Sequence, residues 1–157
     1  MFKLSLALLV LLSFNSKANE IEPAGNLTDP LSANQSIQYQ SLAELEWKYR
    51  LILARSNDAE DITSLFDNYS EAVQDRKIAW FVLSGNKLHS NISKRMGPSL
   101  SAELKRYISR YKNNDMVLIG YDGEAKSVDN VYNISNFFDE IDSMPIRQYE
   151  MSGYTIY

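Results

Sequence analysis

Three short apolar runs, separated by stretches whose apolar residues recur at helical spacing, constrain the fold more than any other feature of the sequence. The runs cover residues 49–55 (YRLILAR), 77–83 (KIAWFVL) and 116–121 (MVLIGY). Each run is short and bounded by polar residues, which is typical of a strand buried within a sheet. The sequence therefore predicts a sheet whose central strands are connected through helices.

Two helices are expected between these strands. Asp58 stands where an N-cap belongs, and Glu60 and Asp61 place negative charge in the first turn, which favours a helix start. The apolar face of this helix consists of Ile62, Leu65, Phe66, Tyr69 and Val73. The second helix is expected to begin after Ser99 or Ser101, either of which could cap it. Its apolar face consists of Leu100, Leu104, Tyr107, Ile108 and Tyr111.

The remaining segments complete the predicted order of elements. Residues 85–98 are expected to form a loop, and the Asp-Gly pair at 122–123 predicts a tight hairpin turn, because both residues tolerate positive φ. Residues 125–128 then return as a short fourth strand. The apolar face of a third helix consists of Ile134, Phe137, Phe138 and Ile141. Met144-Pro145 ends this helix, because proline disfavours helical structure in the residue before it.

The elements follow the order β-α-β-α-β-β-α, which predicts an α/β fold. The first two strands should be parallel, with a right-handed crossover, and the Asp-Gly turn makes the last two antiparallel. We therefore expect a mixed four-stranded sheet with helices on both faces. This order resembles the core of thioredoxin-like proteins. Trp47 and Trp80 lie beside or inside the strand runs, so both are expected in the core.

The N-terminus has the pattern of a cleavable export signal. Lys3 is followed by an apolar run, residues 4–14, that only serines interrupt. Ser16 and Ala18 then stand in the −3/−1 relation of a cleavage site, so cleavage is expected after Ala18. The apolar run is too short for a membrane anchor, because crossing the bilayer takes about 20 residues. We expect a periplasmic or secreted protein with no transmembrane segment in the mature chain.

Composition divides the rest of the chain into three parts. Residues 19–41 are rich in Asn, Gln, Ser and Pro and lack a sustained apolar period, which predicts a flexible linker. The folded domain is expected over residues 42–151, followed by a C-terminal tail at 152–157. The full chain carries a formal charge of −4, with 16 basic and 20 acidic residues. A negative field of this kind disfavours nucleic acid as a partner.

Four segments carry a closer resemblance, which spans about residues 42–151. They are LAELEWKYRLILARS, DRKIAWFVL, MVLIGYDGEAKS and FFDEIDSMPIRQYEM, beginning at positions 42, 75, 116 and 137. Together they resemble a family of secreted domains of unknown function. Its members are short exported bacterial proteins and modules of vertebrate extracellular-matrix proteins that also carry sushi repeats. The resemblance implies a thioredoxin-like fold and export, but no established activity.

The chain lacks the groups that thiol redox chemistry and a typical zinc site require. It contains no cysteine, so we expect no thiol oxidoreductase or peroxidase activity. Residues 55–61 (RSNDAED), which follow the first strand where thioredoxin-like enzymes carry their thiol, hold three acids instead. His89 is the only histidine, and one histidine without cysteine cannot form a typical zinc site. The sequence therefore assigns no catalytic residue, cofactor or metal ligand.

Three residues near the C-terminus form the candidate recognition surface, namely Asp142, Arg147 and Glu150. The Arg147 guanidinium can bind a carboxylate through two hydrogen bonds, either within the domain or on a partner. The internal pairing, with Asp142 or Glu150 clamping the tail onto the domain, is the favoured interpretation. We expect a non-enzymatic binding or interaction module for an unknown protein or small-molecule ligand. The alternative is an envelope enzyme that uses these carboxylates and Arg147 on a small polar substrate, which requires a concave pocket around them.

Overall fold

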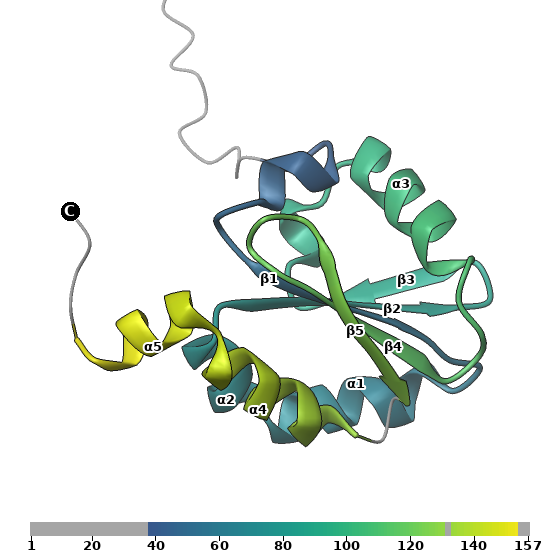
Figure 1. Ribbon diagram of the computed structural model, residues 1–157. Helices are drawn as coiled ribbons and strands as arrows, with labels where there is room; N and C mark the ends of the chain where they lie inside the picture. The colour runs from purple at the N-terminus through teal and green to yellow at the C-terminus, as the bar shows by residue number, and fades with distance from the viewer. Residues whose placement is uncertain (1–37, 131–132, 154–157) are drawn as a thin grey trace, which may run out of the picture. The chain divides into compact units, whose positions relative to one another are not determined.

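The computed structural model describes residues 38–130 and 133–153 (Figure 1). The expected signal peptide, its cleavage after Ala18, nearly all of the linker and the last residues of the tail lie outside the described residues. In the described part of the chain, no helix combines the length and apolar character needed to cross a membrane.

The described chain forms a mixed five-stranded sheet with the order β3-β2-β1-β4-β5. The strands are β1 (Arg50–Arg55), β2 (Ile78–Ser84), β3 (Lys87–Ser90), β4 (Asp115–Ile119) and β5 (Ala125–Asn130). Only β1 and β2 pair in parallel, and the other three pairs are antiparallel. The three apolar runs are thereby confirmed as the three central strands, and these are buried on both faces.

The expected number of four strands is wrong, because part of the expected loop at 85–98 forms β3. The chain turns at Gly85-Asn86 and pairs Lys87 with Ser84, with Gly85 at a φ of +56°. His89 lies opposite Val82 in this strand and not in an open loop. β3 is a short edge strand with little apolar side-chain surface, so its sequence carries no strand pattern.

The helices occupy the expected regions, with two corrections at their ends. The first expected helix is two helices, α1 (Ala59–Asn68) and α2 (Ser70–Asp75), which meet at Tyr69. Asp58 is confirmed as the N-cap of α1, since its carboxylate accepts the N–H of Asp61 at 3.2 Å. The second helix, α3 (Pro98–Ile108), begins earlier than Ser99 or Ser101, because proline is well suited to the first helical position.

The chain continues as a helix beyond the proline that ends the third expected helix. α4 (Ile134–Ser143) stops before Met144, as expected, and α5 (Pro145–Met151) starts directly after it. The described chain also has two short 3-10 helices, η1 (Leu42–Leu45) and η2 (Ser93–Arg95). Figure 1 shows α1, α2 and α4 on one side of the sheet and α3 on the other.

Two apolar layers follow from this arrangement. On one face of the sheet, Ile52 and Trp80 pack with Phe66, Phe137 and other apolar residues of α1, α2 and α4. On the other face, strand side chains of opposite parity pack against α3 and η1. Trp80 is buried, as expected, but Trp47 is 68% exposed. Trp47 lies before β1 at a φ of +60°, outside the strand alternation that would have directed it inward.

Candidate functional site

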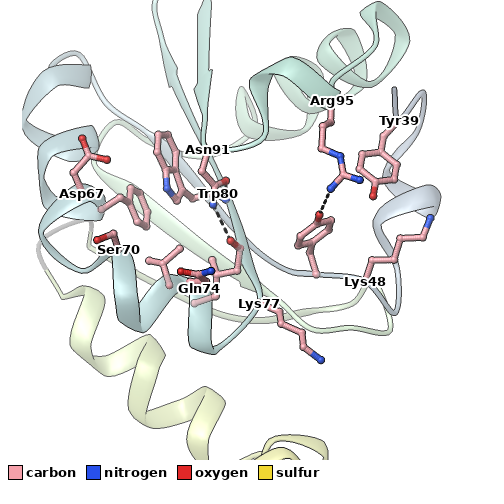
Figure 2. Close-up of a pocket in the computed structure, with 13 residues that line it drawn as sticks. Tyr39, Lys48, Asp67, Ser70, Gln74, Lys77, Trp80, Asn91 and Arg95 are labelled. Carbon is pink, nitrogen blue, oxygen red and sulfur yellow. Dashed lines mark hydrogen bonds between the residues drawn. The ribbon is translucent and has the colours of Figure 1, made fainter. Parts of the chain in front are cut away.

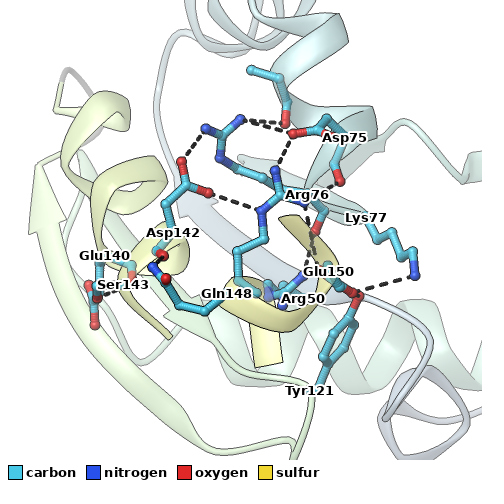
Figure 3. A network of polar contacts seen from close by, with 12 residues as sticks. Arg50, Asp75, Arg76, Lys77, Tyr121, Glu140, Asp142, Ser143, Gln148 and Glu150 are labelled. Atoms are coloured by element: carbon cyan, nitrogen blue, oxygen red, sulfur yellow. Dashed lines mark hydrogen bonds and ion pairs between the residues drawn. The ribbon is translucent and has the colours of Figure 1, made fainter. Parts of the chain in front are cut away.

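The three residues of the expected recognition surface lie together, and Figure 3 shows Asp142 and Glu150 among other charged side chains. Arg147 of α5 is 5% exposed, and its Nε donates to Oδ1 of Asp142 at 3.1 Å. Its Nη1 lies 3.7 Å from Oε2 of Glu150. Its Nη2 and Nη1 also bind Asp75, at the end of α2, through the carboxylate and the backbone carbonyl. Both carboxylates predicted as internal partners of Arg147 therefore lie beside it.

Two further arginines, which the sequence did not single out, complete the cluster. Arg76 forms an ion pair with Asp142, so this carboxylate is shared between two guanidinium groups. Arg50, the first residue of β1, is 1% exposed, and its Nη1 donates to Glu150 at 3.2 Å and to the carbonyl of Arg76 at 3.0 Å. We call the following six residues the arginine network: Arg50, Asp75, Arg76, Asp142, Arg147 and Glu150.

The break between α4 and α5 positions this network. Proline at position 145 fixes φ at the start of α5, and Met144 before it is extended, with a ψ of 138°. The chain therefore changes direction, and Arg147 and Glu150, three residues apart on α5, face Asp142, α2 and β1. The network thus connects the C-terminal helix pair to segments that lie 66 to 100 residues earlier.

The electrostatics favour the ionised forms of two network carboxylates, Asp142 and Glu150. Burial opposes ionisation of Asp142, but hydrogen bonds from Arg76 and Arg147 outweigh it and hold its pKa below the ordinary value. Burial likewise opposes ionisation of Glu150, but the charge of Arg50 and a hydrogen bond from Tyr121 lower its pKa. Burial raises the pKa of Tyr121 to about 12. Carboxylates paired in this way are poorly suited to proton transfer near neutral pH.

A groove of about 660 Å³ lies at the edge of the sheet, near the start of β2 (Figure 2). We call it the β2 groove. Its apolar surface comes from Phe66, Val73, Ile78 and Trp80. Its polar and charged side chains include Lys48, Asp67, Ser70, Gln74, Lys77, Asn91 and Arg95. In Figure 2, Asp67 and Ser70 lie at one end of the groove, and Tyr39, Lys48 and Arg95 lie at the other.

At the edge of β2, a side-chain amide takes the place of a neighbouring strand, which leaves space for the groove. β3 pairs with β2 only from Phe81 onward. Before that point, the Asn91 side chain accepts the N–H of Trp80 at 3.0 Å and donates to the carbonyl of Ile78 at 2.9 Å. The backbone groups at this edge are thus satisfied without a neighbouring strand. The ring of Trp80 stacks on Phe66, with centroids 4.9 Å apart, and forms part of the groove wall.

A second hollow of about 250 Å³ lies beside the arginine network. It is lined by the exposed Trp47, by Arg50 and Tyr121, and by the turn at residues 144–146, among others. Asp142, Arg147 and Glu150 are absent from the lining of this hollow and from that of the β2 groove. The segment after β1 is a closed turn, in which Ser56 is 3% exposed and its Oγ accepts the N–H of Asp58.

The structure also bears on whether the described residues can hold a metal ion. Among residues 38–130 and 133–153, no group of three or more His, Cys, Asp or Glu side chains is placed to hold a metal ion. His89 lies on β3 with its side chain partly buried.

Sequence reasoning did not find the β2 groove. Its lining comes from Tyr39, the segment before β1, α1, α2, β2 and the segment that contains Asn91 and Arg95. No local pattern marks such a set, because each member looks like an ordinary core, helix-surface or loop residue in its own segment. Asn91 offered no signal either, because β3, the strand that precedes it, carries no strand pattern in the sequence.

The fold and these sites define a mixed α/β domain with a buried arginine network and an open groove beside β2. The chain belongs to the family described as a domain of unknown function (DUF4174), whose sequence profile matches residues 41–150. The matched range contains all five strands and all of α5 except Met151. No curated protein and no solved structure matches the chain.

Proposed function

We propose that this protein is an exported, non-catalytic binding module that holds a small-molecule ligand in the β2 groove. The groove itself carries the proposal. Its volume of about 660 Å³ is within the range of small-molecule sites, which combine apolar surface with a few polar groups. Val73, Ile78 and Trp80 supply the apolar surface, and the charged and amide side chains at the rim supply the polar groups.

The proposed scaffold is thioredoxin-like. Support comes from the strand order β2-β1-β4-β5, in which β1 and β2 are parallel and the other pairs are antiparallel. α1 and α2 connect β1 to β2, and β3 is an addition at the β2 edge. In this scaffold the segment after β1 holds no sulfur, and Asp58 and Asp61 place negative charge there. Because thiol chemistry requires a thiolate, we propose that this scaffold binds a ligand instead.

The paired state of the network carboxylates favours binding over the alternative of an envelope enzyme. Such an enzyme would use Asp142, Arg147 and Glu150 on a small polar substrate. Both carboxylates contact arginines, both have lowered pKa values, and neither lines the two hollows described above. We propose that these three residues act mainly as an internal clamp for α5.

A neutral apolar fluorophore tests the groove. N-phenyl-1-naphthylamine is expected to bind the wild-type protein at one site, with a rise in its fluorescence, because the groove offers apolar surface. Gln74→Tyr places a bulky ring at the rim and should weaken binding about tenfold or more. Glu71→Tyr, on an exposed position of the same helix outside the groove, should leave binding unchanged.

Two results would count against this function. Equal binding by the Gln74 and Glu71 variants would place the fluorophore elsewhere on the protein. No saturable binding by the wild-type protein would contradict a ligand-binding groove altogether.

Export is the second part of the proposal. It is supported by the charge, apolar run and small residues of positions 1–18. Protein released by osmotic shock from expressing bacteria is expected to begin at Asn19 when its N-terminal sequence is determined. A chain that stays in the spheroplast fraction and retains Met1 would overturn export.

A further inference from the structure

Two cations share one aromatic ring at an end of the β2 groove (Figure 2). Nζ of Lys48 lies 5.0 Å from the ring centroid of Tyr39, and Cζ of Arg95 lies 5.4 Å from the same centroid. Tyr49 packs edge-on against Tyr39, with centroids 6.2 Å apart. Its hydroxyl accepts a hydrogen bond from Nη1 of Arg95 at 3.0 Å. These four side chains form what we call the Tyr39 cluster.

Neither cation of the Tyr39 cluster forms an ion pair within the described residues. Nζ of Lys48 donates to the backbone carbonyl of Glu44 at 2.7 Å, but the Glu44 carboxylate instead accepts the N–H of Gln40. The Arg95 side chain is exposed, and among the described residues its guanidinium hydrogen-bonds only to the Tyr49 hydroxyl. The three arginines of the network, by contrast, all contact carboxylates. The Tyr39 cluster therefore concentrates positive charge that no acid of the described chain neutralises.

The other lining residues make the distribution of charge along the groove uneven. Lys77 adds a third cation to the lining, although it also lies 3.4 Å from Glu150. Asp67 is the only acid among the lining residues, and Figure 2 shows it at the end opposite the Tyr39 cluster. Between the two ends lie the apolar side chains of Ile78 and Trp80. A complementary ligand has an anionic group at one end and an apolar body beside it.

We infer that the β2 groove binds a small organic anion with a flat apolar body, such as an aromatic carboxylate or sulfonate. The anionic group contacts Arg95 and Lys48, and the apolar body lies against Ile78 and Trp80. Arg95 can present further guanidinium N–H donors to the anion while Nη1 stays bound to Tyr49. This inference rests on the proposed function, because it specifies the ligand of the same groove.

A pair of related fluorophores separates charge recognition from apolar binding. 1-Anilino-8-naphthalenesulfonate carries an anionic sulfonate, whereas N-phenyl-1-naphthylamine has the same ring system without it. Arg95→Gln is expected to weaken binding of the sulfonate about fivefold to tenfold and to change binding of the neutral compound less than about twofold. Arg95→Lys keeps the charge and should retain most of the sulfonate affinity.

A matched control uses an arginine in a similar local setting. Arg110 is exposed and lies over the ring of Tyr107, 5.6 Å from its centroid, but it does not line the groove. Arg110→Gln should leave the affinity for both fluorophores unchanged. Circular dichroism melting of each variant verifies that the fold is intact, which is expected because Arg95 and Arg110 are both exposed.

Each other outcome has a defined meaning. Equal weakening of both fluorophores by Arg95→Gln would show that Arg95 shapes the groove and would overturn anion recognition. Unchanged binding of both would also overturn it, while leaving the groove as a site for neutral ligands. Failure of both fluorophores to bind the wild-type protein would overturn the proposed function together with this inference.

Discussion

Glu150→Ala is expected to lower the free energy of unfolding by about 3 kcal/mol, because it leaves a buried charge without its carboxylate. Arg50 is 1% exposed, and Glu150 is its only acidic partner within the described residues. Two of the Arg50 nitrogens, Nε and Nη2, already lack hydrogen-bond partners there. What remains for Arg50 in the variant is the Arg76 carbonyl and the ring of Tyr121, 4.0 Å from its guanidinium carbon.

Urea unfolding followed by circular dichroism measures this loss. Glu124→Ala is the matched control, because the Glu124 side chain is 78% exposed and, within the described residues, pairs only with Lys126, at 3.4 Å. The control should change stability by less than about 0.5 kcal/mol. Replacing both partners, as Arg50→Met with Glu150→Leu, should recover much of the loss, since the buried charge of Arg50 is then removed together with its partner. An effect of Glu150→Ala no larger than that of the control would refute the clamp.

The pH dependence of the free energy of unfolding provides a second measurement of the contribution of Glu150. The pKa of Glu150 is lowered in the folded state, so its contribution is fully present above the pKa of the unfolded chain. That contribution is lost as the pH falls through the lower, folded pKa. Wild-type stability should therefore decline on acidification below about pH 5, and part of this decline should be absent in Glu150→Ala. Asp142, Asp122 and Asp129, whose pKa values are also lowered, contribute to the decline in both proteins.

Phe137→Ala is expected to lower the free energy of unfolding by about 4 kcal/mol, which is the cost of emptying a well-packed aromatic site. Phe137 is 1% exposed and belongs to the apolar layer that joins α4 to the sheet. Losing its ring removes apolar contact and leaves a cavity that neighbouring helices cannot fully close. Because α4 leads directly into α5, the same change should also destabilise the position of α5, which carries two residues of the arginine network.

Asp139→Ala tests whether this effect belongs to the buried face of α4. Asp139 is two residues away on the same helix, and its side chain is exposed. Alanine there should change stability by less than about 0.5 kcal/mol in the same urea experiment. Similar losses for the two variants would contradict the assignment of Phe137 to the apolar layer.

The elements that bury a periodic apolar face could be predicted from the sequence. The three central strands appear where the apolar runs place them, and so do most apolar-face residues of α1, α3 and α4, whereas Tyr69, expected on the face of the first helix, is 41% exposed. β3 could not be found in this way, because an edge strand of four residues that is partly exposed needs no apolar alternation. Trp47 was misplaced for a related reason. Positive φ directs it away from the core, and no rule based on residue type predicts that conformation for tryptophan.

The two candidate sites differ in the same respect, because one could be predicted in part from the sequence and the other could not. Asp142, Arg147 and Glu150 lie within nine residues of one another, so helix geometry brings their possible pairing within reach of sequence reasoning. Asp75 is 72 residues from Arg147, and Arg50 is 100 residues from Glu150. Only the tertiary fold makes these contacts. The β2 groove depends on even more segments, and for that reason it is visible in the structure alone.

The amide of Asn91 also determines how the sheet meets other chains. An open strand edge offers backbone donors and acceptors that strands of neighbouring molecules can join, and sheets grow in that way. At Ile78 and Trp80 one side chain already takes up the donor and the acceptor. A strand of another molecule would have to displace the Asn91 side chain before it could pair with β2 at this point. The start of β2 can thus remain open for a small ligand to enter without also becoming a seed for aggregation.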